Sequence, residues 1–220
     1  MKSFLRDNGL TLALLGLFLV SLAGQMAAGF QAENHERLEH GLALIGFGAF
    51  LKGGQFLSTL FENWESEFLQ MWAYVMLTAY LFQRGSPESK DPDKAAPQDR
   101  DPALDAGKAG APWPVRAGGL AAWLYGRSLG FAMLALFAAS FVLHWVNSAR
   151  LAADEAIEHG TPPPSLLQHL ASGEFWFESF QNWQSEFLST AVLVVLAIFL
   201  RERGSAQSKP VAAPHAQTGG

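Results

Sequence analysis

Two glutamates in the sequence occupy positions where a carboxylate could bind a proton or another ion. Glu67 lies in the stretch Asn-Trp-Glu-Ser-Glu-Phe-Leu, and Glu186 lies in the matching stretch Asn-Trp-Gln-Ser-Glu-Phe-Leu, 119 residues later. Both stretches run into apolar segments, and an ionisable group within a membrane span is costly and therefore usually functional. The two carboxylates predict an ion or proton site, with His144 as a third member.

The same motif also has a purely structural interpretation. Asn63 and Asn182 could cap helices by accepting hydrogen bonds from free backbone N–H groups. Trp64 and Trp183 could anchor those helices at the depth of the lipid headgroups, where an indole has both an apolar and a polar neighbour. Capping and anchoring are the preferred interpretation, and the ion site stays open beside it.

A second repeated motif, Glu-x-x-Glu-His-Gly, could bind a metal ion. Positions i, i+3 and i+4 of a helix share one face, so each copy would present two carboxylates and an imidazole to a divalent cation. The candidate ligands are Glu36, Glu39, His40, Glu155, Glu158 and His159. The preferred alternative is an exposed helix end, with the histidine near the negative end of the helix dipole and the glycine after the last turn.

The elements that would position these residues follow from an internal repeat. A shift of 119 residues aligns the first part of the chain with the second, which indicates two copies of one unit. Residues 10–30 and 129–149 are uncharged runs, each about 31 Å long as a helix and so long enough to cross a membrane. Second spans are expected at about 64–82 and 183–200, each opened by the Asn-Trp motif.

These runs predict an all-α integral membrane protein with four transmembrane helices, arranged as two parallel two-helix repeats with short external interfacial helices. The first repeat covers residues 1–90 and the second covers 119–209. Residues 91–118 are rich in Pro, Ala, Asp and Lys and are predicted to be a disordered cytoplasmic linker. Residues 210–220 are predicted to be a disordered tail.

Lysine and arginine gather on the side of the membrane that holds the termini and the linker, so both termini are expected to be cytoplasmic. The expected location is the bacterial inner membrane, with several passes.

Composition excludes several classes of protein. The chain is 50% hydrophobic and 16% charged, with a net charge of −5. It has no basic patch of the kind that binds nucleic acid. The absence of cysteine excludes disulfides and thiolate metal sites. No motif for a cofactor or a catalytic triad occurs, so no cofactor is expected and an enzymatic function is not favoured.

The two motif copies, each followed by a span and by Arg-Gly-Ser-x-x-Ser-Lys, resemble a family of small bacterial inner-membrane proteins known only as a domain of unknown function. The resemblance implies a membrane location and this fold, and it implies no reaction or ligand. We therefore expect a non-enzymatic structural or interaction protein whose partners are the lipid bilayer and a second copy or another membrane protein. The alternative is a small ion- or proton-coupled transporter with its path between the two repeats.

Overall fold

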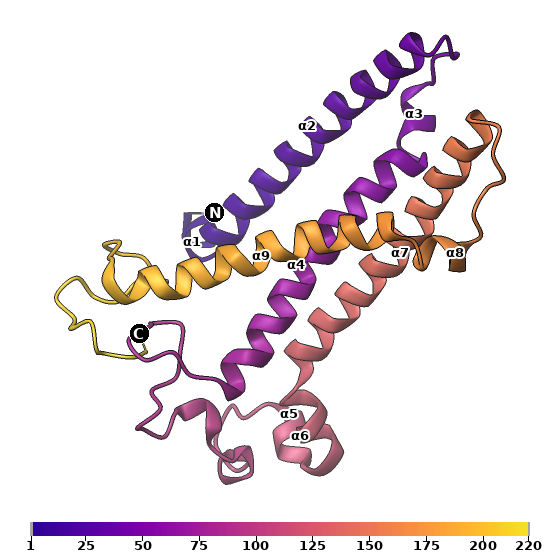
Figure 1. Cartoon of the computed structure of the whole chain (residues 1–220). Coiled ribbons are helices and arrows are strands. Elements are labelled where there is room, and N and C mark those ends of the chain that lie inside the picture. Colours follow the sequence, from indigo (N-terminus) through magenta and orange to yellow (C-terminus); the bar gives the residue numbers. More distant parts are fainter. Residues whose placement is uncertain (1, 220) are drawn as a thin grey trace. The chain divides into compact units, whose positions relative to one another are not determined.

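The computed structural model describes residues 2–219, and its regular structure is helical, with no strand in that range (Figure 1). The longer elements are α2 (Gly9–Glu39), α4 (Gly54–Tyr80), α7 (Ser128–Glu158) and α9 (Gly173–Phe199). The short ones are α1 (Lys2–Asp7), α3 (Phe47–Phe50), η1 (Pro97–Asp99), η2 (Pro102–Asp105), α5 (Trp113–Ala117), α6 (Gly119–Tyr125) and α8 (Leu166–Leu170). The prediction of an all-α protein is confirmed.

Three of the described helices, α2, α7 and α9, are long and apolar enough to cross a membrane. By length and composition these helices are compatible with a membrane protein. Helix α4 has the same length as α9, 27 residues, but carries Glu62, Glu65 and Glu67 where α9 carries Gln181, Gln184 and Glu186. The second half of α4, residues 70–80, is also much less apolar than the matching residues 189–199 of α9, so α4 is not among the three.

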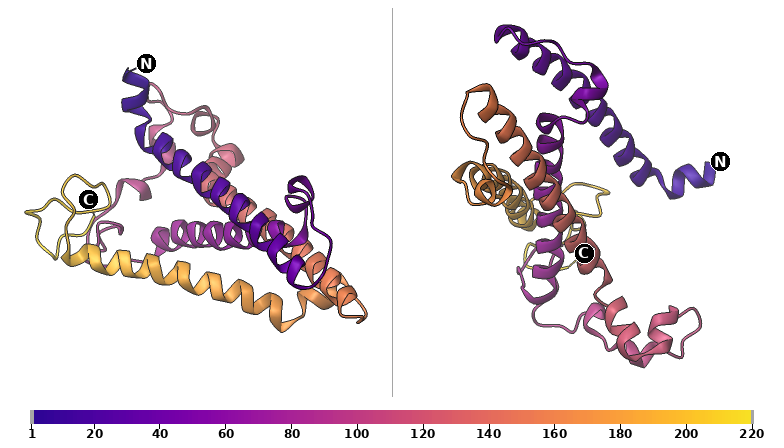
Figure 2. Two further views of the ribbon diagram at one scale, coloured as in Figure 1. Left: turned by 90° about the horizontal axis from the view of Figure 1, so that it is seen from above. Right: turned by 90° about the vertical axis from the view of Figure 1, so that its right-hand side faces the viewer.

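The long helices follow the 119-residue offset seen in the sequence. Helix α7 has the bounds of α2 moved along the chain by 119 residues, and α9 has the bounds of α4 moved by the same amount. A short helix precedes the first long helix of each set, α1 before α2 and α6 before α7. Figure 2 shows the bend between α1 and α2, where Asn8 leaves the helical conformation with φ −123° and ψ 14°.

The two helices that carry the Asn-Trp motif begin earlier than expected. Helix α4 starts at Gly54 and α9 starts at Gly173, so Asn63 and Asn182 lie well inside them. At α9 the cap is Ser172, whose Oγ accepts a hydrogen bond from the Phe175 N–H at 3.2 Å. The predicted N-cap role of the two asparagines is therefore wrong.

Helices α2 and α7 end in the same way, after the Glu-x-x-Glu-His-Gly motif. Gly41 and Gly160 adopt positive φ angles of 69° and 67°. In each copy the glycine N–H donates to the carbonyl three residues back, at 3.1 Å, and the next N–H donates to the carbonyl five residues back, at 2.7 and 2.8 Å. This is a Schellman motif, so the interpretation of these glycines as helix ends is confirmed.

The Arg-Gly-Ser-x-x-Ser-Lys segments form the same turn twice. Gly85 and Gly204 both have φ 87°. Ser89 Oγ accepts from a backbone N–H six residues earlier at 2.8 Å and donates to the next carbonyl at 3.0 Å, and Ser208 makes the same two bonds at 3.0 and 3.1 Å. Both glycines lie beyond the end of their helix, so they shape the following turn.

By its contacts the chain forms two compact units. The first unit comprises Met1–Leu60 and Leu143–Leu170, and the second comprises Phe61–Val142 and Ala171–Gly220. Each unit therefore contains residues from both predicted repeats.

The core of the first unit is aromatic. Phe50 is 2% exposed, and its ring lies 5.8 Å from that of Phe30 and 5.2 Å from that of Phe56. A side chain at Gly29 would collide with the Phe50 ring, so the glycine makes room for it on α2.

A second glycine lets α4 approach α7 in the first unit. A Cβ atom at Gly54 would lie 3.0 Å from the Leu151 nitrogen and 3.1 Å from the Asn147 carbonyl oxygen. The two backbones are thus in direct contact where α4 begins.

In the second unit, rings from α7 and α9 pack together. Phe175 is fully buried, with its ring 5.7 Å from Phe141 and 5.6 Å from Trp176. Farther along α9, the Trp183 ring lies 6.3 Å from that of Phe137. This packing fixes the rotation of α9 about its axis and so decides which of its polar residues meet α4.

Candidate functional site at the paired motifs

In the second unit the two copies of the Asn-Trp motif contact each other. The Trp183 indole Nε1 donates a hydrogen bond to a carboxylate oxygen of Glu65 at 2.9 Å. Glu65 is fully buried, whereas Gln184, the residue that occupies its place in the second copy, is exposed. A buried carboxylate needs hydrogen-bond donors, and α9 supplies one.

One helical turn farther along, Gln70 of α4 reaches the backbone of α9. Its Nε2 lies 3.0 Å from the Glu186 carbonyl oxygen and 2.5 Å from Thr190 Oγ1. Ser189 Oγ is 3.4 Å away and extends the same group. An amide that bonds across two helices in this way holds them at one separation and one register.

On the other side of the indole, Asn182 joins the helices again. Its Nδ2 donates to the Glu62 carboxylate and to the Glu178 backbone carbonyl, the latter at 3.2 Å. A carboxylate oxygen of Glu62 also lies within 4.8 Å of one from Glu178. Two carboxylates at this separation repel each other unless a proton or a cation lies between them.

The two glutamates singled out by the sequence, Glu67 and Glu186, come close enough to repel each other electrostatically. Glu67 is exposed and Glu186 is partly exposed. The structure thus brings the predicted pair together, but the buried carboxylate is their neighbour Glu65, which sequence reasoning missed. The sequence did mark Glu65 in one way: the two motif copies differ at this position, with glutamate in the first and glutamine in the second.

His144, the third predicted member of the ion site, is fully buried on α7. It belongs to the first unit, whereas Glu67 and Glu186 belong to the second. Trp64, predicted as an anchor, stacks edge-on against Phe61 at 5.5 Å, and Asn63 is exposed.

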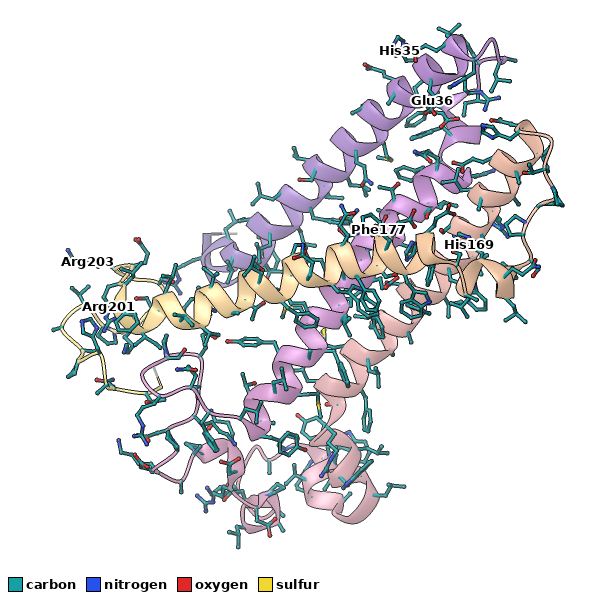
Figure 3. The ribbon with its side chains drawn as sticks, viewed as in Figure 1. His35, Glu36, His169, Phe177, Arg201 and Arg203 are labelled. Atoms are coloured by element: carbon teal, nitrogen blue, oxygen red, sulfur yellow. The ribbon has the colours of Figure 1, made fainter. Side chains whose placement is uncertain are left out.

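The predicted metal ligands lie at the ends of α2 and α7 in the first unit. Five of the six line a cavity of about 570 Å³, whose polar lining is Glu33, Glu36, Arg37, His40, Gln55, Asp154, Glu155, Glu158 and His159. Figure 3 shows Glu36 near the end of α2. Glu39 is absent from this lining and instead lies 3.3 Å from the His35 ring.

The two imidazoles at this cavity are held alike. His40 Nδ1 lies 3.0 Å from the Glu36 carbonyl oxygen, and His159 Nδ1 lies 2.8 Å from that of Glu155. The bond places the proton on Nδ1 and leaves Nε2 able to accept. Among residues 2–219, however, no three ligand atoms of this cavity lie within 4.8 Å of one another, so the carboxylates and imidazoles do not form a compact metal-binding group.

A buried cation lies in the segment after α9. Lys209 is 1% exposed, and burial lowers its pKa, with a further contribution from Arg201. Its Nζ lies within hydrogen-bonding distance of four backbone carbonyl oxygens, those of Gly85 (2.6 Å), Pro214 (3.3 Å), His215 (2.8 Å) and Gln217 (3.1 Å). Lys209 thereby ties the last residues of the chain to the turn that follows α4.

Arg201, labelled in Figure 3, completes the end of α9. Its Nη1 donates to the carbonyl oxygens of Ala197, Ile198 and Leu200 at 3.4, 3.1 and 2.7 Å. At the end of α4, Lys90 has the same role. Its Nζ donates a hydrogen bond to the Ala79 carbonyl oxygen at 2.8 Å. A cation therefore complements the negative end of the helix dipole at both α4 and α9.

Comparison with known proteins gives a family and no further relative. No curated protein and no solved structure matches the chain. The sequence profile of a domain of unknown function, DUF6766, matches residues 1–220, the whole chain. The protein therefore belongs to the DUF6766 family.

Proposed function

We propose that this chain is a four-span protein of the bacterial inner membrane, built from two parallel two-helix repeats, with a structural or interaction role and no catalysis. The observation that carries the proposal is the set of hydrogen bonds between the two motif copies, Trp183 to Glu65, Asn182 to Glu62, and Gln70 to α9. The polar atoms of the motif bond to each other, which is how polar residues hold membrane helices together.

The repeat architecture is supported by geometry as well as by sequence. Helix bounds recur at an offset of 119 residues, both Schellman motifs recur, and so does the turn at Gly85 and Gly204. Two copies of one unit, each made of an outward and an inward span, explain all three recurrences.

Helix α4 is the proposed fourth span. Its 27 residues reach about 40 Å, which exceeds the roughly 30 Å of a hydrocarbon core. Glu62 and Glu65, in the first half of the helix, bond to Asn182 and Trp183, so both carboxylates have partners on α9. This pairing offsets the cost of placing them in or near the bilayer.

With four spans, both termini and the linker would face the cytoplasm, and the Glu-x-x-Glu-His-Gly ends of α2 and α7 would face outward. Reporter fusions at Pro97, Pro163 and Gly220 test this arrangement. The expected result is inside, outside, inside. An external reporter at Gly220 would overturn the four-span architecture.

A transporter is the second candidate, because Glu67 and Glu186 lie within electrostatic range and Glu62 and Glu178 lie within 4.8 Å. Paired carboxylates between parallel repeats could bind a proton or cation in transit.

Ion or proton flux into proteoliposomes separates the two functions. If the structural role is right, the wild-type chain shows no flux above protein-free vesicles, and Glu67→Gln with Glu186→Gln changes nothing but stability. If wild type conducts and this double variant does not, the transporter replaces our proposal. Glu174→Gln with Glu202→Gln, two exposed glutamates of the second unit, gives the matched control for charge.

A further inference from the structure

The segment Trp113–Arg127, which contains α5 and α6, presents large apolar side chains to the surroundings. Trp113 is 68% exposed, Leu120 71% and Tyr125 46%. Helix α6, Gly-Leu-Ala-Ala-Trp-Leu-Tyr, has no charged residue at all. Large apolar side chains that are exposed in such number on a short helix indicate a surface that contacts something apolar, such as lipid or another protein.

The charge around this segment has one sign. No Asp or Glu occurs between Asp105 and Asp154, while Arg116 and Arg127 lie within the segment and are exposed. The nearest cations that precede the segment in the sequence instead form ion pairs. Arg100 and Lys108 both pair with Asp105. The segment is therefore aromatic, apolar and positively charged together.

Aromatic contacts and a hydrogen bond fix the position of α6 relative to the start of α7. The Trp123 ring lies 5.8 Å from Phe131 in the first turn of α7, and the Arg127 guanidinium stacks on Trp123 at 4.6 Å from the ring centre. Ser128 Oγ donates to the Tyr125 carbonyl oxygen at 2.8 Å, which closes the corner between α6 and α7. Arg127 thus stands directly before the apolar run 129–149.

These features fit one occupant. If α7 spans the bilayer, the residues just before its apolar run lie at the depth of the headgroups, where Trp and Tyr are preferred. An arginine there meets lipid phosphates, which its guanidinium binds through two parallel hydrogen bonds. With no carboxylate nearby to repel them, headgroups of net negative charge are favoured over neutral ones.

We infer that Trp113–Arg127 is an interfacial lipid-binding segment, which lays its aromatic and leucine side chains into the bilayer surface and binds anionic phospholipid headgroups through Arg116 and Arg127. The inference rests on the proposed function in one respect, that α7 spans the membrane. It names the lipid class that this end of the protein recognises.

Because the chain has no cysteine, single introduced cysteines can carry a spin label without background. Labels at Leu120→Cys on α6, Leu136→Cys on α7 and Gly107→Cys in the preceding turn are compared in vesicles of neutral lipid, with and without anionic phosphatidylglycerol. The readout is collision of the label with oxygen, which enters the bilayer, against collision with a water-soluble nickel chelate. We expect the Leu136 label to be embedded, the Gly107 label to be in water, and the Leu120 label to be shielded from the chelate.

Arg116→Gln with Arg127→Gln tests the headgroup preference. Since each surface cation favours an anionic membrane by about fivefold, the double variant should lower the phosphatidylglycerol dependence of the Leu120 label by more than tenfold. Arg116→Lys with Arg127→Lys should retain most of it. Lys94→Gln with Arg100→Gln, which removes the same charge outside the segment, should change it little.

The outcomes separate the two claims. A Leu136 label in water would overturn the proposed function together with this inference. An embedded Leu136 label with a Leu120 label in water would overturn the inference alone. Shielding of Leu120 that is equal in neutral and anionic vesicles, or that requires a protein partner, would overturn the anionic-lipid assignment.

Discussion

The indole nitrogen of Trp183 lies 2.9 Å from a carboxylate oxygen of Glu65, and it joins a tryptophan present in both motif copies to a glutamate present in only one. The two motif copies therefore play different parts in the contact. Glu65 is buried against α9, and Gln184, at the same place in the second copy, faces outward.

Breaking this contact should destabilise the protein, and the effects of replacing Glu65 and Trp183 should not be additive. Trp183→Phe removes one hydrogen-bond donor from the buried Glu65 carboxylate, which typically costs about 1–3 kcal/mol. The test is a double-mutant cycle in detergent. The free energies of unfolding of Glu65→Ala, Trp183→Phe and the double variant give the coupling energy between the two side chains. Gln184→Ala is the control, and its effect should stay within about 0.5 kcal/mol. Equal losses for Glu65→Ala and Gln184→Ala would contradict the burial of Glu65.

Gly54 should not tolerate a side chain. A methyl group there would press on the α7 backbone at Asn147 and Leu151, and overpacking of this kind costs about 1–3 kcal/mol. Gly173 begins α9 as Gly54 begins α4, but it has open space around its Cα. Gly173→Ala should therefore be neutral or slightly stabilising. A thermal unfolding midpoint that falls for both variants alike would refute the close approach.

Replacing Lys209 should release the end of the chain. Lys209→Met leaves four carbonyl oxygens without their shared donor, and hydrogen bonds to a charged group contribute about 1.5–3 kcal/mol. Amide hydrogen exchange of residues 212–219 should rise by about tenfold or more. Arg203→Met, an exposed cation in the preceding turn, is the control and should leave that exchange unchanged.

The turn after α4 should loosen in acid. Arg84 holds Asp93 through two bonds of 2.5 and 3.3 Å, and this hydrogen bonding, aided by the Arg84 charge, lowers the pKa of Asp93. Because the pKa in the fold is below that of the unfolded chain, the stabilisation is present above the ordinary carboxyl pKa and is lost as the pH falls through the lowered value. A carboxyl NMR titration measures this shift.

Arg84→Gln is the test variant for the same titration, and it should return Asp93 toward its ordinary pKa. The second copy offers a comparison, since Ala212 stands where Asp93 does and cannot pair with Arg203. If Asp93 titrates alike in wild type and Arg84→Gln, the ion pair does not form in solution.

Sequence reasoning predicted the helical class, the offset between the long helices and the helix ends at Gly41 and Gly160, because these depend on local patterns. It misplaced the beginnings of α4 and α9, since Asn63 and Asn182 resemble caps in isolation. Ser172 was the better signal, because it precedes a glutamate and an apolar run.

The choice between carboxylates could not be made from local pattern. Glu65 and Glu67 are two residues apart, and which of them is buried depends on the rotation of α4 against α9. That rotation is held by contacts between residues far apart in the sequence, such as Gln70 of α4 with the Glu186 carbonyl oxygen of α9.

The inequality of Glu65 and Gln184 has a consequence for assembly. The first copy supplies the buried carboxylate of Glu65, and the second supplies the indole of Trp183 that donates to it. A contact between two second copies would offer that indole an amide oxygen in place of the carboxylate, because Gln184 stands where Glu65 does. Carrying both copies on one polypeptide supplies one carboxylate for one indole, without the need to find a partner chain.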